Sequence, residues 1–124
     1  MEGLPRVVLP DKQKPMYKFI QMYIDEQPFF RAGSFISYHS DILAEILRQA
    51  ELTFEEMEDP FGDLVPRPKG THYELVGAGT MIHGETGFLL YDISRSYGLT
   101  PNQKHLDDLA PYILDGIKFK IRGE

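Results

Sequence analysis

The fold is decided by residues 17–36, which read YKFIQMYIDEQPFFRAGSFI. Over residues 17–24, successive side chains alternate between two faces, as they do in a β-strand. One face carries Tyr17, Phe19, Gln21 and Tyr23, and the other carries Lys18, Ile20, Met22 and Ile24. Residues 25–28, DEQP, are typical of a turn, and residues 29–36 have the composition of a returning strand. The stretch therefore predicts a β-hairpin.

The sequence that follows the hairpin changes to a helical period. Residues 40–51 place apolar side chains at i, i+1, i+4, i+5 and i+8, which is the spacing of one helix face. The apolar side chains are those of Ile42, Leu43, Ile46, Leu47 and Ala50. Residues 72–83 and 88–93 then predict two strands, joined by the turn sequence GETG at 84–87.

The C-terminal part predicts a short helix and a last strand. Pro111 argues against a helix that runs straight through residues 101–114. We therefore expect a shorter helix that is capped by Asp107 or Asp108 and has Pro111 near its first turn. Residues 117–121, IKFKI, alternate as a strand. The order β-β-α-β-β-α-β predicts an α+β fold with a single mixed or antiparallel sheet and two helices.

Two segments of the chain lack regular periodicity. Residues 1–16 contain three prolines and predict an extended N-terminal arm, which leaves residues 17–124 as a single domain. Residues 52–71 contain three further prolines and predict a long acidic loop. Its charged residues are Glu55, Glu56, Glu58, Asp59, Asp63, Arg67 and Lys69. With so little to bury, this loop is expected to be mobile and dispensable for folding.

Composition excludes several classes of protein. The chain has 124 residues, no cysteine and a formal net charge of −6. The lack of cysteine excludes disulfides, thiolate metal sites and cysteine nucleophiles, and the negative charge argues against nucleic-acid binding. No apolar run approaches the length of a membrane span, and the N-terminus does not resemble a signal peptide. We expect a monomeric cytoplasmic protein without a membrane or nucleic-acid partner.

His39 is the strongest single candidate for chemistry. It lies at the start of the predicted helix, where free N–H groups attract anions and the dipole disfavours imidazolium. Such a histidine tends to be neutral and to be available as a base. The alternative is that His39 is only a residue at the helix start that packs against the sheet edge.

The segment SRSYG at 94–98 is a second candidate. Its hydroxyls, guanidinium and glycine suit the binding of an oxyanion, although a plain polar loop after a strand is the alternative. Three other histidines have simpler interpretations. His72 with Glu74 and His83 with Glu85 are expected to be surface pairs, with a divalent metal site as the less favoured alternative, and His105 is expected to be a solvated loop residue. The sequence GAGTMI at 77–82 lacks the third glycine of a dinucleotide motif, so its glycines indicate a bulge or a close backbone approach.

Taken together, four blocks of the sequence resemble the Janus/Ocnus family. YKFI at 17–20 resembles the family's FKYV, and YHSDI at 38–42 resembles its YHADI. VGAG at 76–79, followed by His83, resembles the family's LGGG and a later histidine. YDISRSYG at 91–98 resembles the family's YGYSMAYG. The resemblance spans residues 17–121, which is nearly the whole predicted domain. The sequence departs from the family pattern at Thr80, where an arginine is usual, at Arg95, where an apolar residue is usual, and in the longer segment 52–71.

The resemblance implies a metal-independent phosphatase, with no cofactor, that acts on phosphohistidine in proteins. It gives His39 the role of general base, Lys18 that of a phosphate ligand, and Ser94, Arg95 and Ser96 further contacts to phosphate. Arg95 is then expected to supply the charge that is missing at Thr80. The alternative function is a phosphate- or phosphoprotein-binding regulatory module of the same fold, without turnover, that docks partners through residues 52–71.

Overall fold

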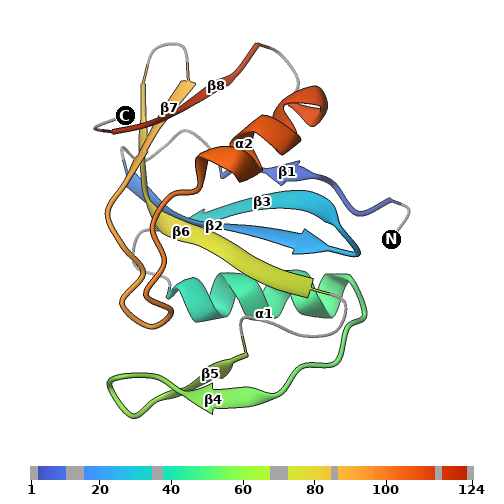
Figure 1. Cartoon of the computed structure of the whole chain (residues 1–124), viewed down its shortest axis with the longest axis vertical. Helices are drawn as coiled ribbons and strands as arrows, with labels where there is room; N and C mark the ends of the chain where they lie inside the picture. Colours follow the sequence, from blue (N-terminus) through green and yellow to red (C-terminus); the bar gives the residue numbers. More distant parts are fainter. Residues whose placement is uncertain are drawn as a thin grey trace.

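The predicted hairpin forms two adjacent inner strands of a six-stranded mixed sheet in the computed structural model (Figure 1). The structure describes residues 3–10, 16–34, 38–67, 73–84, 87–113 and 116–122. The strands are β1 Val7–Val8, β2 Met16–Ile24, β3 Gln27–Ser34, β4 Glu56–Glu58, β5 Leu64–Pro66, β6 Tyr73–His83, β7 Gly87–Tyr91 and β8 Lys118–Ile121, and the helices are α1 His39–Gln49, α2 Gln103–Leu109 and the 3₁₀ turn Ala110–Tyr112. His72, Glu85 and the predicted end of the second strand at 35–36 lie outside the described residues.

The sheet has the order β1-β3-β2-β6-β7-β8, with α1 and α2 on its opposite faces (Figure 1). The central pairs β3–β2, β2–β6 and β6–β7 are antiparallel, while β1 and β8 add parallel edges. The predicted α+β class with one mixed sheet and two helices is therefore confirmed. The main elements follow the predicted order, and three short strands, β1, β4 and β5, are additional.

The alternation of β2 explains why both faces of the sheet are covered. Ile20, Met22 and Ile24 are buried against α1, whereas Tyr17 and Phe19 are buried in the cluster that includes α2. A strand that buries both faces needs a helix on each side, because each apolar face must be removed from water. Lys18 lies on the α1 side of this strand, beyond the apolar part of that face.

The N-terminal arm is extended, as predicted, but it is also part of the sheet. Val7 and Val8 pair with β3 as a parallel edge strand. The buried guanidinium of Arg31 in β3 holds the arm by donating to the carbonyl oxygens of Pro5 at 2.6 Å and Arg6 at 3.3 Å. Proline-rich sequence prevents a helix but not edge pairing, so the segment has a structural role that its composition did not indicate.

The prediction of an irregular loop is wrong for residues 56–66, which form the antiparallel hairpin β4–β5 below α1 (Figure 1). Val65 and Pro66 are buried, and Asp59 at the turn is only 7% exposed. The hairpin is tied to the segment after β7, because the Tyr97 hydroxyl donates to the Pro66 carbonyl at 3.0 Å. Short strands with few apolar residues give a weak periodic signal, so this element was missed.

The hairpin is expected to contribute to stability through Val65. Val65→Ala removes about two methylene groups from a buried position, which predicts a loss of about 1.5 kcal/mol in the free energy of unfolding. The neighbouring Leu64→Ala is the matched control, since Leu64 is 68% exposed and its truncation is expected to change stability by less than about 0.5 kcal/mol. Chemical denaturation measures both. Equal, small effects would mean that the hairpin is as dispensable as its composition suggested.

The second helix also differs from its prediction. α2 begins after Asn102, whose side chain accepts a hydrogen bond from the His105 N–H at 2.9 Å, so neither Asp107 nor Asp108 caps it. Pro111 does not interrupt α2, because it lies in the first turn of the 3₁₀ segment that follows. Within the described ranges, no helix has the length and the apolar run that crossing a bilayer requires.

Candidate functional site

The start of α1 meets the centre of the sheet through His39. His39 is the first residue of the helix, and its Nε2 lies 2.8 Å from the carbonyl oxygen of Gly79 in β6. A Cβ at Gly79 would collide with the carbonyl oxygen of Tyr91 in β7. The close backbone approach expected at Gly79 is therefore confirmed, and it fixes the position of the carbonyl that holds the histidine ring.

This hydrogen bond determines the tautomer of His39. A carbonyl oxygen only accepts, so Nε2 carries the ring hydrogen and Nδ1 of the neutral ring has a free lone pair. Burial lowers the pKa of His39 below its ordinary value, and the charge of Lys18 lowers it further, against the opposing effects of the Gly79 hydrogen bond and Asp92. His39 is therefore neutral at pH 7, in the form that a general base requires.

Lys18 comes from the neighbouring strand to the same place. It is paired with Thr80 across β2 and β6, and its Nζ lies 5.4 Å from the centre of the Tyr38 ring, just before α1. Thr80 is buried and pairs on its other side with Tyr91. Strand pairing thus places the Lys18 cation next to the end of β7, and both lie near the start of α1. These three parts are far apart in the sequence.

The segment after β7 turns tightly beside this site. Asp92 has φ of +73° and Gly98 has φ of +67°, both in the left-handed region that favours glycine. The Ser94 N–H donates to the Leu99 carbonyl at 2.8 Å and the Gly98 N–H to the Ser94 carbonyl at 2.7 Å. This turn presents Arg95 and Ser96 outward, while Ser94 is fully buried.

The predicted site residues do not all meet. Lys18, His39, Arg95 and Ser96 line one cavity of about 760 Å³, together with Thr80. Ser94 does not line it, and its buried hydroxyl has no hydrogen-bond partner among the described residues. The Ser96 hydroxyl donates to the Asp59 carboxylate at 3.1 Å, so its hydrogen is not directed at a ligand. The cationic side chains of Lys18 and Arg95 are therefore the groups best placed to bind an anion here.

Sequence reasoning missed the carboxylates of this cavity, which outnumber its two cations. They belong to Asp41, Asp59, Asp63 and Asp92. Asp59 accepts from the N–H groups of Phe61 and Asp63, both at 2.9 Å, and the Asp63 N–H bond is the main reason why the pKa of Asp59 lies below its ordinary value. The sequence DPFGD at 59–63 is a turn signature, and it was the available signal for this Asp-centred loop.

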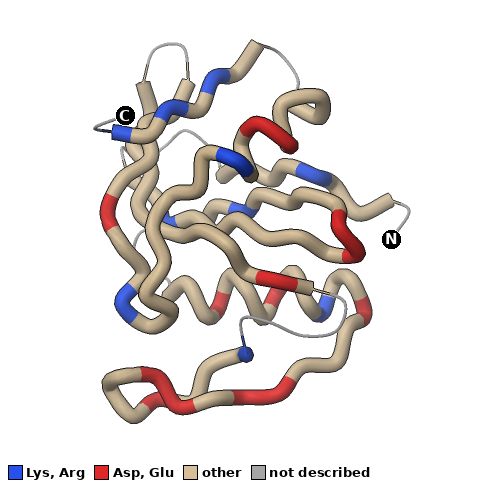
Figure 2. Tube along the Cα trace, in the orientation of Figure 1, with Lys and Arg blue, Asp and Glu red and all other residues tan. Residues whose placement is uncertain are grey.

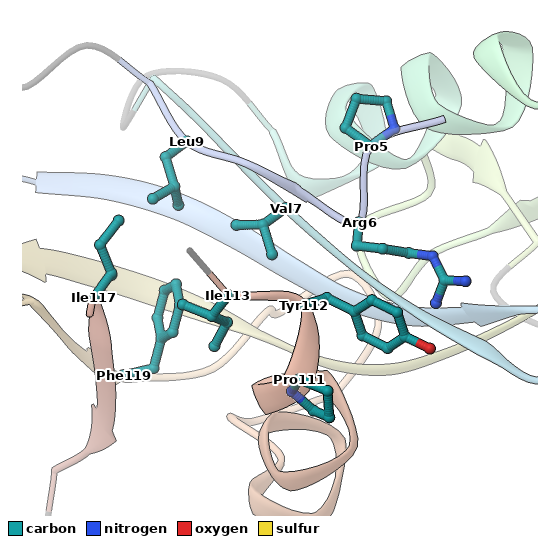
Figure 3. Close-up of a pocket in the computed structure, with 9 residues that line it drawn as sticks. All are labelled: Pro5, Arg6, Val7, Leu9, Pro111, Tyr112, Ile113, Ile117 and Phe119. Atoms are coloured by element: carbon teal, nitrogen blue, oxygen red, sulfur yellow. The ribbon is translucent and has the colours of Figure 1, made fainter. Parts of the chain in front are cut away.

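A second cavity lies on the other side of the molecule, between the N-terminal arm and the C-terminal part of the chain (Figure 3). It has a volume of about 520 Å³ and mostly apolar walls. The Arg6 guanidinium lies over the Tyr112 ring, 4.2 Å from its centre, and donates to Gln27 at 2.7 Å. The cation is thus already engaged in holding the arm. Among the described residues, no three histidine or acidic side chains gather as metal ligands would.

Comparison with known proteins adds no relative to this picture. No model of a known protein family matches the chain, and a search of curated proteins gives no significant match.

Proposed function

We propose that this chain is a cytoplasmic, monomeric, metal-independent phosphatase that hydrolyses the P–N bond of phosphohistidine in proteins, with His39 as general base. The observation that carries the proposal is the hydrogen bond from His39 Nε2 to the Gly79 carbonyl. It leaves an unprotonated Nδ1 on a histidine that lines a cavity together with Lys18 and Arg95. A base beside cations is the arrangement that hydrolysis of a phosphoryl group requires.

The proposed reaction consumes one water molecule. The oxygen of the water forms a bond to phosphorus while its proton passes to Nδ1 of His39. The P–N bond breaks, and its electron pair stays on the imidazole nitrogen of the substrate. The proton held by His39 then passes to that nitrogen, so the products are histidine and inorganic phosphate. Lys18 and Arg95 offset the negative charge on the phosphoryl oxygens throughout.

The backbone after β7 supports the Janus/Ocnus resemblance from which the proposal starts. The family pattern YGYSMAYG has glycine at the positions of Asp92 and Gly98. Both positions have left-handed backbone here, which glycine adopts without strain. The chain therefore keeps the conformation that the pattern requires even where it has an aspartate. Its carboxylate is used locally, since it accepts a hydrogen bond from the Ile93 N–H at 2.9 Å.

A direct assay tests the proposal against the alternative of a binding module. The release of phosphate from a phosphohistidine peptide and from a phospholysine peptide is followed by ³¹P NMR, with and without a chelator. Turnover that resists the chelator and disappears in His39→Ala supports the phosphatase. Phosphate binding without turnover supports a regulatory module, and turnover lost on chelation would instead indicate a metal-dependent hydrolase.

Lys18→Ala is expected to weaken binding of inorganic phosphate and of substrate together. Charged hydrogen bonds contribute about 1.5–3 kcal/mol, so the expected loss is roughly tenfold or more. The remaining affinity should depend less on salt, because one cation is gone. Lys120→Ala, at an exposed position of β8 that does not line the cavity, is the matched control and should leave phosphate affinity unchanged. Equal phosphate affinities of the two variants would mean that Lys18 is a solvated residue at the edge of the sheet and does not bind phosphate.

Arg95→Met tests whether Arg95 replaces the charge missing at Thr80. The substitution keeps the length of the side chain and removes the guanidinium, which can grip two phosphoryl oxygens at once. We expect kcat/KM to fall by an amount equivalent to roughly 1.5–3 kcal/mol. If Arg95→Met leaves kcat/KM unchanged while Thr80→Arg raises it, Arg95 does not replace the missing charge, and the phosphate site is weaker than the sites of the family that the chain resembles.

A further inference from the structure

Several exposed apolar side chains surround the mouth of the candidate site. Of the large apolar side chains that are exposed in the described part of the chain, four line this one cavity. They are Tyr38 at 68% exposure, Phe61 at 64%, Leu64 at 68% and Ile93 at 45%. We call these four residues the apolar rim. Exposed apolar groups that gather around one cavity mark a surface that binds another molecule, since scattered ones would need no explanation.

Acidic side chains lie beside the apolar rim. Two of its residues, Phe61 and Leu64, belong to the β4–β5 hairpin, and Figure 2 shows acidic positions along β4 and in the turn that leads to β5. Glu56, Glu58 and Asp63 are exposed there, while the nearby Arg67 is paired with Glu55 at 3.1 Å. Within the cavity, the lining carboxylates outnumber Lys18 and Arg95. A bare phosphate dianion therefore meets a surface whose net charge opposes it.

The hairpin that carries this surface is held against the site. The Asp59 carboxylate at its turn accepts the hydrogen bond from Ser96, and the Pro66 carbonyl at its end accepts the one from Tyr97. Both donors belong to the turn that also presents Arg95. The apolar rim and the phosphate-binding cations thus form one preorganised surface, which lowers the entropic cost of binding an extended partner.

We propose that the apolar rim and the acidic hairpin bind the polypeptide segment around the phosphorylated residue, and that they select segments in which apolar and basic side chains flank it. This inference rests on the proposed phosphatase function and names its substrate class. Lysine or arginine beside the phosphoryl group supplies the positive charge that the cavity lacks, and apolar neighbours cover Phe61 and Leu64. An anionic membrane is a poor occupant, because the hairpin carboxylates repel it.

Matched peptides test the substrate class. One peptide carries phosphohistidine between leucine and lysine residues, and a second replaces each lysine by glutamate. We expect kcat/KM to be at least tenfold higher for the basic peptide, with a difference that shrinks as salt is raised. Free phosphoramidate, assayed on the wild-type protein, reports P–N hydrolysis without any flanking residues, so it separates failure of the phosphatase proposal from failure of the selectivity.

Variants of the β4–β5 hairpin test whether its residues cause the preference for the basic peptide. The double variant Glu56→Lys/Glu58→Lys should bring the ratio between the two peptides to about one or below, and Phe61→Ser/Leu64→Ser should raise KM for the basic peptide severalfold. Glu26→Lys, in the β2–β3 turn, and Val8→Ser, on the edge strand β1, are the matched charge and apolar controls and should keep the wild-type ratio.

Binding is measured in parallel by calorimetry with the same two peptides in unphosphorylated form, so the result does not depend on turnover. Tighter binding of the basic peptide that is lost in the hairpin variants supports the inference, even if no substrate is hydrolysed and the phosphatase proposal fails. Equal binding of the two peptides, or a preference that the hairpin variants leave intact, overturns it.

Discussion

His39→Asn is expected to lower the turnover of a phosphohistidine substrate by at least ~10²-fold, the range that a positioned general base contributes. Asparagine is chosen because it replaces the imidazole by a smaller polar amide, which stands near the position of Nδ1 and does not reach the Gly79 carbonyl that Nε2 of the histidine contacts at 2.8 Å. It cannot take up a proton, so it removes the basic function while the helix start stays in place. Steady-state kinetics and circular dichroism measure the two effects separately.

The pH dependence gives this prediction a second measurement. Because burial, and after it the charge of Lys18, lowers the pKa of His39, the imidazole stays neutral below the ordinary histidine pKa. The wild-type rate should therefore hold as the pH falls through about 6.5 and decline only at lower pH. Lys18→Met removes a cause of the lowered pKa, so the acidic decline should move to higher pH.

His83→Asn is the control for the catalytic prediction. His83 lies at the end of β6, with its ring against Phe88, and does not line the site cavity. It should keep the wild-type rate and pH profile. Near-normal turnover in a folded His39→Asn protein, or an equal loss in His83→Asn, would remove His39 from the role of base.

The elements of the fold that bury one face over many residues were predictable from the sequence. The alternation over residues 17–24 places Ile20 and Phe19 on opposite faces, and the structure buries them in the two different clusters. The start of α1 was predicted within one residue, so His39 was placed correctly at the helix start. These predictions succeeded because burial acts on many residues at once and leaves a repeated pattern.

Features that depend on single polar contacts were not predictable. The β4–β5 hairpin is closed by backbone bonds to the Asp59 carboxylate and by contacts to Ser96 and Tyr97, which lie more than 30 residues away. Local composition contains no trace of such partners. The sequence DPFGD at 59–63 marks a turn, but strand pairing and loop packing decide which acidic residues line the cavity together with Lys18.

His105 is the clearest error of sequence interpretation. Predicted as a solvated loop residue, it is fully buried between β2 and α2. Its Nε2 donates to the Met22 carbonyl at 2.9 Å, and its Nδ1 accepts from the Gln21 amide at 3.2 Å. Gln21 in turn donates to the Asn102 carbonyl at 2.9 Å and accepts from the Asn102 N–H at 2.8 Å. Hydrophobic periodicity cannot predict a buried hydrogen-bond network of this kind, because its polar residues have the same composition as surface positions.

This network predicts that His105→Leu is strongly destabilising. Leucine fills most of the volume but removes the hydrogen bond to the Met22 carbonyl and leaves one Gln21 N–H buried without its partner. Each unsatisfied group costs about 1–3 kcal/mol, so the expected loss in the free energy of unfolding is about 3 kcal/mol, or roughly 10 °C in Tm. His83→Leu is the matched control, because His83 is half-buried and its ring contacts Phe88.

The same residue links stability to pH. Burial lowers the pKa of His105, so the folded protein holds it neutral while the unfolded chain takes up a proton below about pH 6.5. The contribution of His105 to the free energy of unfolding is thus fully present above about pH 6.5. It is lost as the pH falls towards the lowered pKa of His105 in the folded protein. His39 behaves alike, so the wild-type protein should lose up to about 1.4 kcal/mol per pH unit for each histidine. Denaturation curves between pH 7 and 5 should show a shallower slope in His105→Leu than in His83→Leu. Parallel slopes, or a His105→Leu protein as stable as the control, would mean that the ring is not held neutral in this network.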